Sequence, residues 1–127
     1  MKDLRASHND AYVLVYQLQG SAFLNIEGRT VQLEHGDMVV VDAAKTSGFS
    51  FLNAHHQICI CLPRATVDTM YSADSKLVGR KICCKTQFGQ MVGEFVHELS
   101  SVLNSPKNEV EAMHRALLAL LKPLLST

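Results

Sequence analysis

The chain of 127 residues has no excess of charge of either sign, because 12 basic side chains balance 12 acidic ones. Without a net positive field, direct nonspecific binding of nucleic acid by this segment is not expected. The sequence also lacks an apolar run of membrane-spanning length, and its start, MKDLRASHND, has no apolar signal region. We therefore expect a cytoplasmic protein without membrane contact. Its length predicts one domain, residues 1–127, whose core needs no metal or disulfide.

The four cysteines lack the spacing of a zinc site. Cys59 and Cys61 are two residues apart, Cys83 and Cys84 are adjacent, and neither pair has a matching second pair or histidines. If HQICICLP is a strand, Cys59 and Cys61 point to one face, and apolar side chains take the other: Ile58, Ile60 and Leu62. We expect reduced, buried cysteines that behave as small apolar side chains. A redox role for either pair is the alternative.

Catalytic motifs are missing as well. His97-Glu98 begins like a zinc-protease motif, but Ser101 stands where the second histidine belongs. His55 and His56 would point to opposite faces of a strand, which does not favour a shared metal. The sequence has no phosphate-binding glycine loop, no nucleophile elbow and no paired inward carboxylates. We therefore predict no metal, no cofactor and no enzymatic activity.

Glycines at regular intervals are the strongest structural signal that is present. Gly20, Gly28 and Gly36-Asp37 follow one another eight residues apart, with short alternating segments between them. This rhythm is typical of antiparallel hairpins, in which glycine supplies the positive φ of a tight turn and Asp37 binds its own backbone. The predicted strands are Tyr12–Leu18, Ala22–Ile26, Arg29–Leu33, Met38–Asp42, Phe49–Leu52 and His56–Leu62.

After Pro63 the apolar period changes from two to about three and a half. Residues 63–72 are expected to contain a short helix, with Pro63 near its first position. A polar loop is expected over residues 72–86, followed by an antiparallel helical hairpin over residues 87–125. Ser105 and Pro106 are suited to begin the second helix of this hairpin. The two apolar stripes comprise Phe88, Met91, Val92, Phe95, Leu99, Val102 and Leu103, then Val110, Met113, Leu117, Leu120, Leu121 and Leu124.

Pro123 is expected to end or kink the second helix. Leu124 and Leu125 follow it, and an apolar pair at this place suggests packing on something further. We therefore expect that the sequence is part of a longer protein.

The glycine spacing and the Gly-Asp turn resemble a cupin barrel over residues 10–62. Metal-binding cupins have two histidines and a carboxylate before the first glycine, and another histidine on a later strand. Here His8 is the only histidine before Gly20, Val13 stands at the carboxylate position, and residues 46–51 contain no histidine. Since a catalytic metal needs three or four ligands, the resemblance implies a barrel without metal.

Four ordered motifs resemble the amino-terminal domain of AraC-type transcription regulators, and most closely the FeaR-like subgroup. They are QLQG, the run GDMVVVDAAK from Gly36 to Lys45, ICLPRATVD and ALLALLKPLL, and together they cover about Asp10 to Leu125. The resemblance implies an α+β fold, mainly β: a cupin-like antiparallel barrel or jelly roll followed by a helical hairpin. It also implies a small-molecule effector, a homodimer formed through the helices, and DNA contacts made only by a helix-turn-helix domain that this sequence does not include.

Two sets of candidate site residues follow. A sensing pocket is mostly apolar with a few convergent polar groups; the strand residues that fit are Tyr12, Tyr16, Phe23, Asn25, Phe49, Phe51 and His56. The same residues can instead belong to the core. The resemblance assigns dimerisation to the hairpin residues Phe95, Leu99, Leu103, Leu117, Leu120 and Leu121, although packing on the sheet of the same chain would bury them equally well.

A protein of a different class remains as the alternative. It is a stand-alone, metal-free cupin-like binding protein or isomerase. An isomerase needs an inward acid or base with a shifted pKa, for which His56 or Asp42 are the candidates. Asp42 and Lys45 are otherwise expected at a solvated corner.

Overall fold

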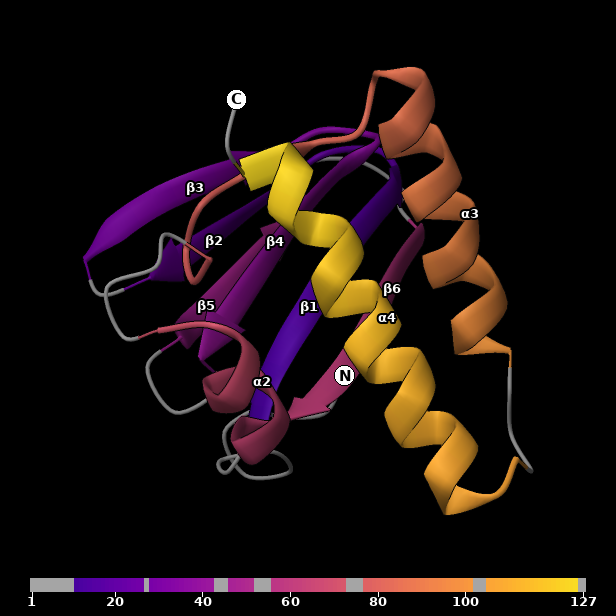
Figure 1. Cartoon of the computed structure of the whole chain (residues 1–127). Helices are drawn as coiled ribbons and strands as arrows, with labels where there is room; N and C mark the ends of the chain where they lie inside the picture. The colour runs from indigo at the N-terminus through magenta and orange to yellow at the C-terminus, as the bar shows by residue number, and fades with distance from the viewer. Residues whose placement is uncertain are drawn as a thin grey trace.

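The computed structural model describes residues 11–26, 28–42, 46–51, 56–72, 77–101 and 105–125, and only the backbone of residues 46–51. It is a mixed α+β structure in which two antiparallel sheets face each other and helices cover the outer side of one sheet (Figure 1). The strands are β1 (Ala11–Gln19), β2 (Ala22–Ile26), β3 (Arg29–Leu33), β4 (Asp37–Asp42), β5 (Thr46–Phe51), β6 (His56–Pro63) and β7 (Ile82–Cys83). The helices are α2 (Arg64–Met70), α3 (Gln87–Ser100) and α4 (Lys107–Leu125).

The four-stranded sheet has the order β6-β1-β4-β7, and the three-stranded sheet has the order β3-β2-β5. Among the described strands the two sheets do not join into a closed barrel. The predicted α+β class, with a mainly β, cupin-like first part and carboxyl-terminal helices, is therefore confirmed, whereas closure of the barrel is not seen. The hairpin turns lie where the glycines predict them, with φ of 74° at Gly20, 82° at Gly28 and 87° at Gly36.

An aliphatic layer fills the space between the sheets. On β1, Val13 and Val15 point into this layer, opposite Val41 and Val39 of β4. The three-stranded sheet completes the cluster with Leu24, Ile26, Val31 and Leu33. Each of these eight side chains is at most 8% exposed, so the layer holds the two sheets together through apolar burial.

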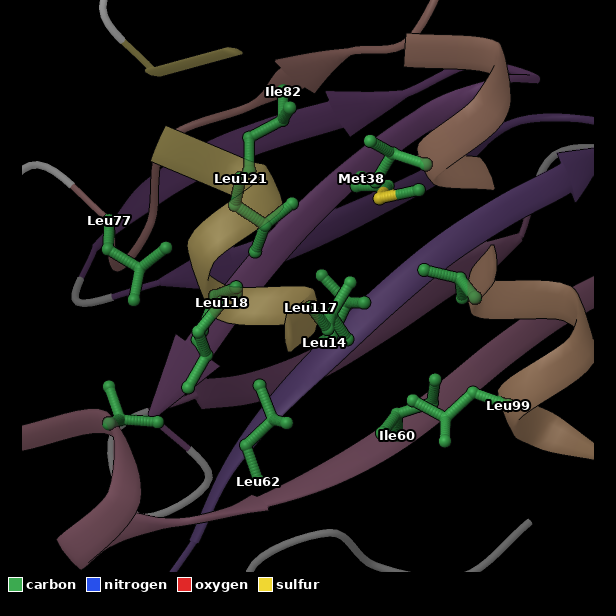
Figure 2. Packing of buried hydrophobic residues seen from close by; sticks show 14 of the residues in the cluster. Leu14, Met38, Ile60, Leu62, Leu77, Ile82, Leu99, Leu117, Leu118 and Leu121 are labelled. Carbon is green, nitrogen blue, oxygen red and sulfur yellow. The ribbon is translucent and has the colours of Figure 1, made fainter. Parts of the chain in front are cut away.

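A second and larger core lies between the four-stranded sheet and the helices. Leu14 of β1 meets Leu117 of α4 at its centre, and Leu118 and Leu121 of the same helix belong to the same cluster on the side toward Leu77 (Figure 2). Ile60 of β6 and Leu99 of α3 extend the same cluster toward α3 (Figure 2). Both faces of the four-stranded sheet are thus covered. This explains why all six residues of β4, which the sequence predicts as a central strand, are buried.

Two features differ from the sequence-based expectations. The predicted loop over residues 72–86 contains β7, which pairs with β4 through Asp37 and Met38. A strand of two residues is too short to show any alternation. Pro123 lies inside α4, which continues to Leu125. The helix tolerates Pro123 because the hydrogen bond that it removes would reach the carbonyl of Ala119, an exposed residue.

The helix boundaries otherwise follow local chemistry. Thr86 caps α3 by accepting a hydrogen bond from Gly89 N at 3.0 Å. Pro63 ends β6 and precedes α2, where its missing N–H costs nothing. No helix in the described part of the chain is long and apolar enough to cross a membrane.

Candidate functional site

The hollows lined by described residues include three of similar size. The β3 hollow, about 520 Å³, lies between residues 29–32 of β3 and residues 78–81. The α3 hollow, about 480 Å³, lies between α3, the end of β1 and the turn at Gly36. The α2 hollow, also about 480 Å³, lies between α2, Tyr12 and residues 71–72 and 77–78. These volumes are within the range of small-molecule sites.

The two tyrosines of β1 lie in different hollows. Tyr12 and Tyr16 both face the helices, because they have the parity of Leu14 rather than that of the inward-facing Val13. Tyr12 lines the α2 hollow and Tyr16 lines the α3 hollow. Burial raises the pKa of both phenols, so each is a neutral hydrogen-bonding group near pH 7.

Tyr12 takes part in a charged cluster at the start of α2. Arg64 donates two hydrogen bonds to Asp42, at 2.8 and 3.3 Å, and its guanidinium lies 4.5 Å from the centre of the Tyr12 ring. The Tyr12 hydroxyl donates to Asp68 at 3.3 Å. The hydrogen bond to Asp42 raises the pKa of Arg64. Asp42 is thus 8% exposed and held in an ion pair, which corrects the expectation of a solvated corner and argues against a role as a free general base.

The other predicted ligand residues do not join the tyrosines. Phe23 and Asn25 point away from the interior of the two sheets, and Asn25 Oδ1 accepts the Gly28 N–H of the following turn at 3.2 Å. His56 is exposed at the start of β6. Phe49 and Phe51 belong to β5, whose side chains lie outside the described residues, as do Lys45, His8 and His55. The predicted set is thus distributed over both sheets, and its role in ligand binding stays a prediction.

A buried polar chain marks one end of the space between the sheets, and sequence reasoning missed it. Gln17 is fully buried with the inward parity of Val13 and Val15, and its amide nitrogen donates to the Gln19 carbonyl at 2.6 Å. Gln57 of β6 donates to Gln17 Oε1 at 2.7 Å. The sequence contained one signal for this buried polar contact, because Gln17 occupies an inward-facing position in the otherwise apolar alternation of YVLVYQL.

The cysteines differ in exposure. Cys84 is buried, as expected, but Cys59 and Cys83 are exposed and Cys61 is intermediate, so the expectation of four buried cysteines is wrong. Cys59 and Cys61 lie opposite Val15 and Val13 on the side of the inner layer, as the alternation predicts. None of these four cysteines, all of which the structure describes, forms a disulfide bond. Desolvation by the surrounding protein atoms raises the pKa of Cys59 and Cys61 although their side chains keep some surface, and burial raises the pKa of Cys84 to about 12; these shifts keep the thiols protonated and weakly nucleophilic.

The predicted dimerisation residues divide by burial. Leu117 and Leu121 are fully buried and Leu99 is 8% exposed, all of them within the helix-side core of the single chain. Their side chains have almost no surface left for a second subunit within this single chain, and their assignment to a dimer contact stays a prediction. Phe95 and Leu120 are partly exposed, and Leu103 lies outside the described residues.

An apolar stripe on α3 remains uncovered. Phe88 is 38% exposed and Met91 63%, and with Phe95 they lie on one side of the helix at spacings of three and four residues. The sequence grouped them with the buried stripe. Helical periodicity does not separate the centre of a wide apolar face from its margin.

Comparisons with known proteins identify the family. The model of the AraC-binding-like domain matches residues 2–126, almost the whole chain. The chain belongs to the AraC-binding-like domain family. Within the described residues, no group of three or more histidine, cysteine, aspartate or glutamate side chains is placed to hold a metal ion.

A solved structure has the same fold as this AraC-binding-like domain. The AraC-like transcriptional activator CuxR matches all of the chain with a TM-score of 0.70 and 11% sequence identity. The chain spans 47% of the length of CuxR, so it corresponds to about half of that protein.

Proposed function

We propose that this AraC-binding-like domain is the effector-sensing and dimerisation part of a bacterial AraC-type transcription regulator that acts in the cytoplasm. It binds a small molecule without transforming it, and DNA is bound through a helix-turn-helix domain outside this sequence. The observation that carries the proposal is the family match over residues 2–126 on a two-sheet fold with helices packed along one face. If the helices have two arrangements and the effector binds one of them more tightly, effector binding would shift the protein toward that arrangement.

The effector is tested by what the protein retains. The purified chain is incubated with a metabolite extract, passed through gel filtration and denatured, and the released small molecules are identified by mass spectrometry. A single compound recovered in proportion to protein supports effector sensing. Turnover of that compound, or no retained compound, contradicts the proposal.

The uncovered stripe of α3 supports the dimer. A second copy of this chain is the partner that best fits the stripe, because a twofold contact places the apolar stripe of one subunit against the same stripe of the other. The stripe borders residues already in the helix-side core, so it is continuous with the packed part of the helical hairpin. We propose an isologous contact through Phe88, Met91 and Phe95, with Leu120 at its margin.

The contact is tested by introducing a negative charge at its most exposed member. Met91→Glu is expected to shift the mass measured by light scattering from two chains to one while the circular dichroism spectrum is unchanged, because Met91 is 63% exposed in the single chain. Gln90→Glu, an exposed neighbour on another side of α3, serves as the control and should leave the dimer intact. A wild-type monomer at high concentration, or a dimer insensitive to Met91→Glu, contradicts the contact.

A further inference from the structure

The β3 hollow concentrates positive charge in a chain whose formal net charge is zero. Its walls are residues 29–32 of β3 and residues 78–81, which run beside β4 through the hydrogen bond from Gly79 N to Val40 O at 2.7 Å. The lining includes Arg29, Arg80 and Lys81 and no acidic side chain. The hollow therefore lies where one edge of the three-stranded sheet meets one edge of the four-stranded sheet.

The backbone holds the Arg29 guanidinium in place. Its Nη2 donates to the Gly79 carbonyl at 2.8 Å, across fifty residues of sequence. Gly79 has a φ of 82°, and a Cβ at this position would lie 2.8 Å from the same nitrogen. Only glycine combines this backbone conformation with so close an approach. One hydrogen bond occupies one of the five N–H donors of the guanidinium, so Arg29 is oriented and retains donor capacity.

Lys81 is only weakly paired. Its Nζ lies 3.9 Å from Asp37 Oδ2, and that oxygen already accepts the Glu34 N–H at 2.9 Å. The Lys81 side chain is 47% exposed, whereas the Asp37 side chain is 6% exposed. The ammonium group therefore retains N–H donors for a further acceptor at the rim of the hollow.

We propose that the β3 hollow binds the anionic group of the effector, a carboxylate or a phosphate, through Arg29 and Lys81, with Arg80 adding a third positive charge. Arginine recognises planar carboxylates and phosphates with paired N–H donors, and lysine adds a compact charge. The exposed Val78 side chain in the wall provides apolar contact for the rest of an organic anion. This inference rests on the proposed effector-sensing function and names the class of its ligand.

The position of the hollow also links it to the helices. Residues 78–81 continue directly into β7, and Cys84 N donates to the Gly36 carbonyl at 3.2 Å. Thr86 then caps α3, so only four residues lie between Lys81 and the helix cap. An anion that draws residues 78–81 toward β3 would act on the start of the helix that carries the proposed dimer contact.

The test is calorimetric titration with ligand pairs that differ in charge. The probes are inorganic phosphate, AMP with adenosine as its neutral counterpart, and succinate with succinamide, all at low ionic strength. We expect the protein to bind at least one anion and not its neutral counterpart. Binding of AMP alone would indicate a phosphate site, and binding of succinate alone would indicate a carboxylate site. Arg29→Gln and Lys81→Gln should each weaken binding about tenfold or more, as expected for loss of a charge-assisted hydrogen bond.

Lys107→Gln, which removes an exposed cation at the start of α4, is the control and should leave the affinity unchanged. Lys81→Gln keeps the test valid if Arg29→Gln perturbs the loop, since Lys81 has only a long contact to Asp37. Absence of anion binding to the wild type, or equal affinity in Lys81→Gln and Lys107→Gln, refutes the inference. The protein could instead retain a neutral or cationic metabolite whose affinity is unchanged in Arg29→Gln and Lys81→Gln. That result refutes the anion site and leaves the proposed effector-sensing function intact.

Discussion

Two glycines one turn apart in α3 should respond differently to the same substitution. An alanine Cβ at Gly89 would lie 2.7 Å from Cys84 Cα and 2.9 Å from its carbonyl carbon. That backbone is held in place by the hydrogen bond from Cys84 N to Gly36 O. An alanine Cβ at Gly93 would instead meet the Tyr16 hydroxyl oxygen at 2.5 Å, the far end of a side chain that borders the α3 hollow.

The magnitudes follow from two opposing effects. Replacing glycine by alanine within a helix stabilises it by up to about 1 kcal/mol, whereas forcing atoms into a packed contact costs about 1–3 kcal/mol. At Gly89 the obstacle is backbone, so we expect a net loss of about 1–2 kcal/mol. At Gly93 the tyrosine can rotate into the hollow, and the two effects nearly cancel. In a Tyr16→Leu background, Gly93→Ala should become stabilising.

Urea unfolding followed by circular dichroism measures these differences as shifts of the midpoint at constant slope. Glu94→Ala, at an exposed position of the same helix, reports helix propensity without a new contact. The reasoning is refuted if Gly89→Ala is as stable as the wild type, or if Tyr16→Leu makes Gly93→Ala less favourable.

Two further predictions concern the helix side of the sheet. Arg64→Met removes both hydrogen bonds to the nearly buried Asp42 and should lower the free energy of unfolding by about 1–3 kcal/mol. The double variant Arg64→Met/Asp42→Asn should lose less, because it leaves no buried charge without its partner. Equal losses for the single and the double variant in urea unfolding would contradict this. Burial lowers the pKa of His114 below 6.5, partly offset by Glu111, so the unfolded chain binds the proton more readily. The wild type should therefore lose stability as the pH falls below about 6.5, and His114→Gln should reduce that slope in thermal melts at successive pH values; an unchanged slope would argue against it.

The strands and helices were largely predictable because their signals are local. Glycine turns fix the hairpins, and the change of period after Pro63 separates sheet from helices. β7 gave no signal, since its pairing depends on β4, which precedes it by about forty residues. The continuation of α4 through Pro123 places the lost hydrogen bond at Ala119, an exposed residue, and local propensity does not show this exposure.

The candidate site was less predictable, because alternation separates two faces without saying what covers each. In β1 both faces are covered, the valines fully by the second sheet and the tyrosines in part by the helices. The sequence therefore grouped Tyr12 and Tyr16 in one candidate site, whereas in the structure they line different hollows, and their role in ligand binding stays a prediction. The β3 hollow combines residues about fifty positions apart, and only the folded chain shows the contact between Arg29 and Gly79.

A thermal-shift screen of a metabolite library tests the central claim, effector sensing, most directly. A ligand present at about 1,000 times its Kd stabilises the native state by about 4 kcal/mol, which raises Tm on the order of 10 °C for a chain of this size. We expect such a saturable rise for one compound or a narrow class of compounds. A library that leaves Tm unchanged throughout would contradict it.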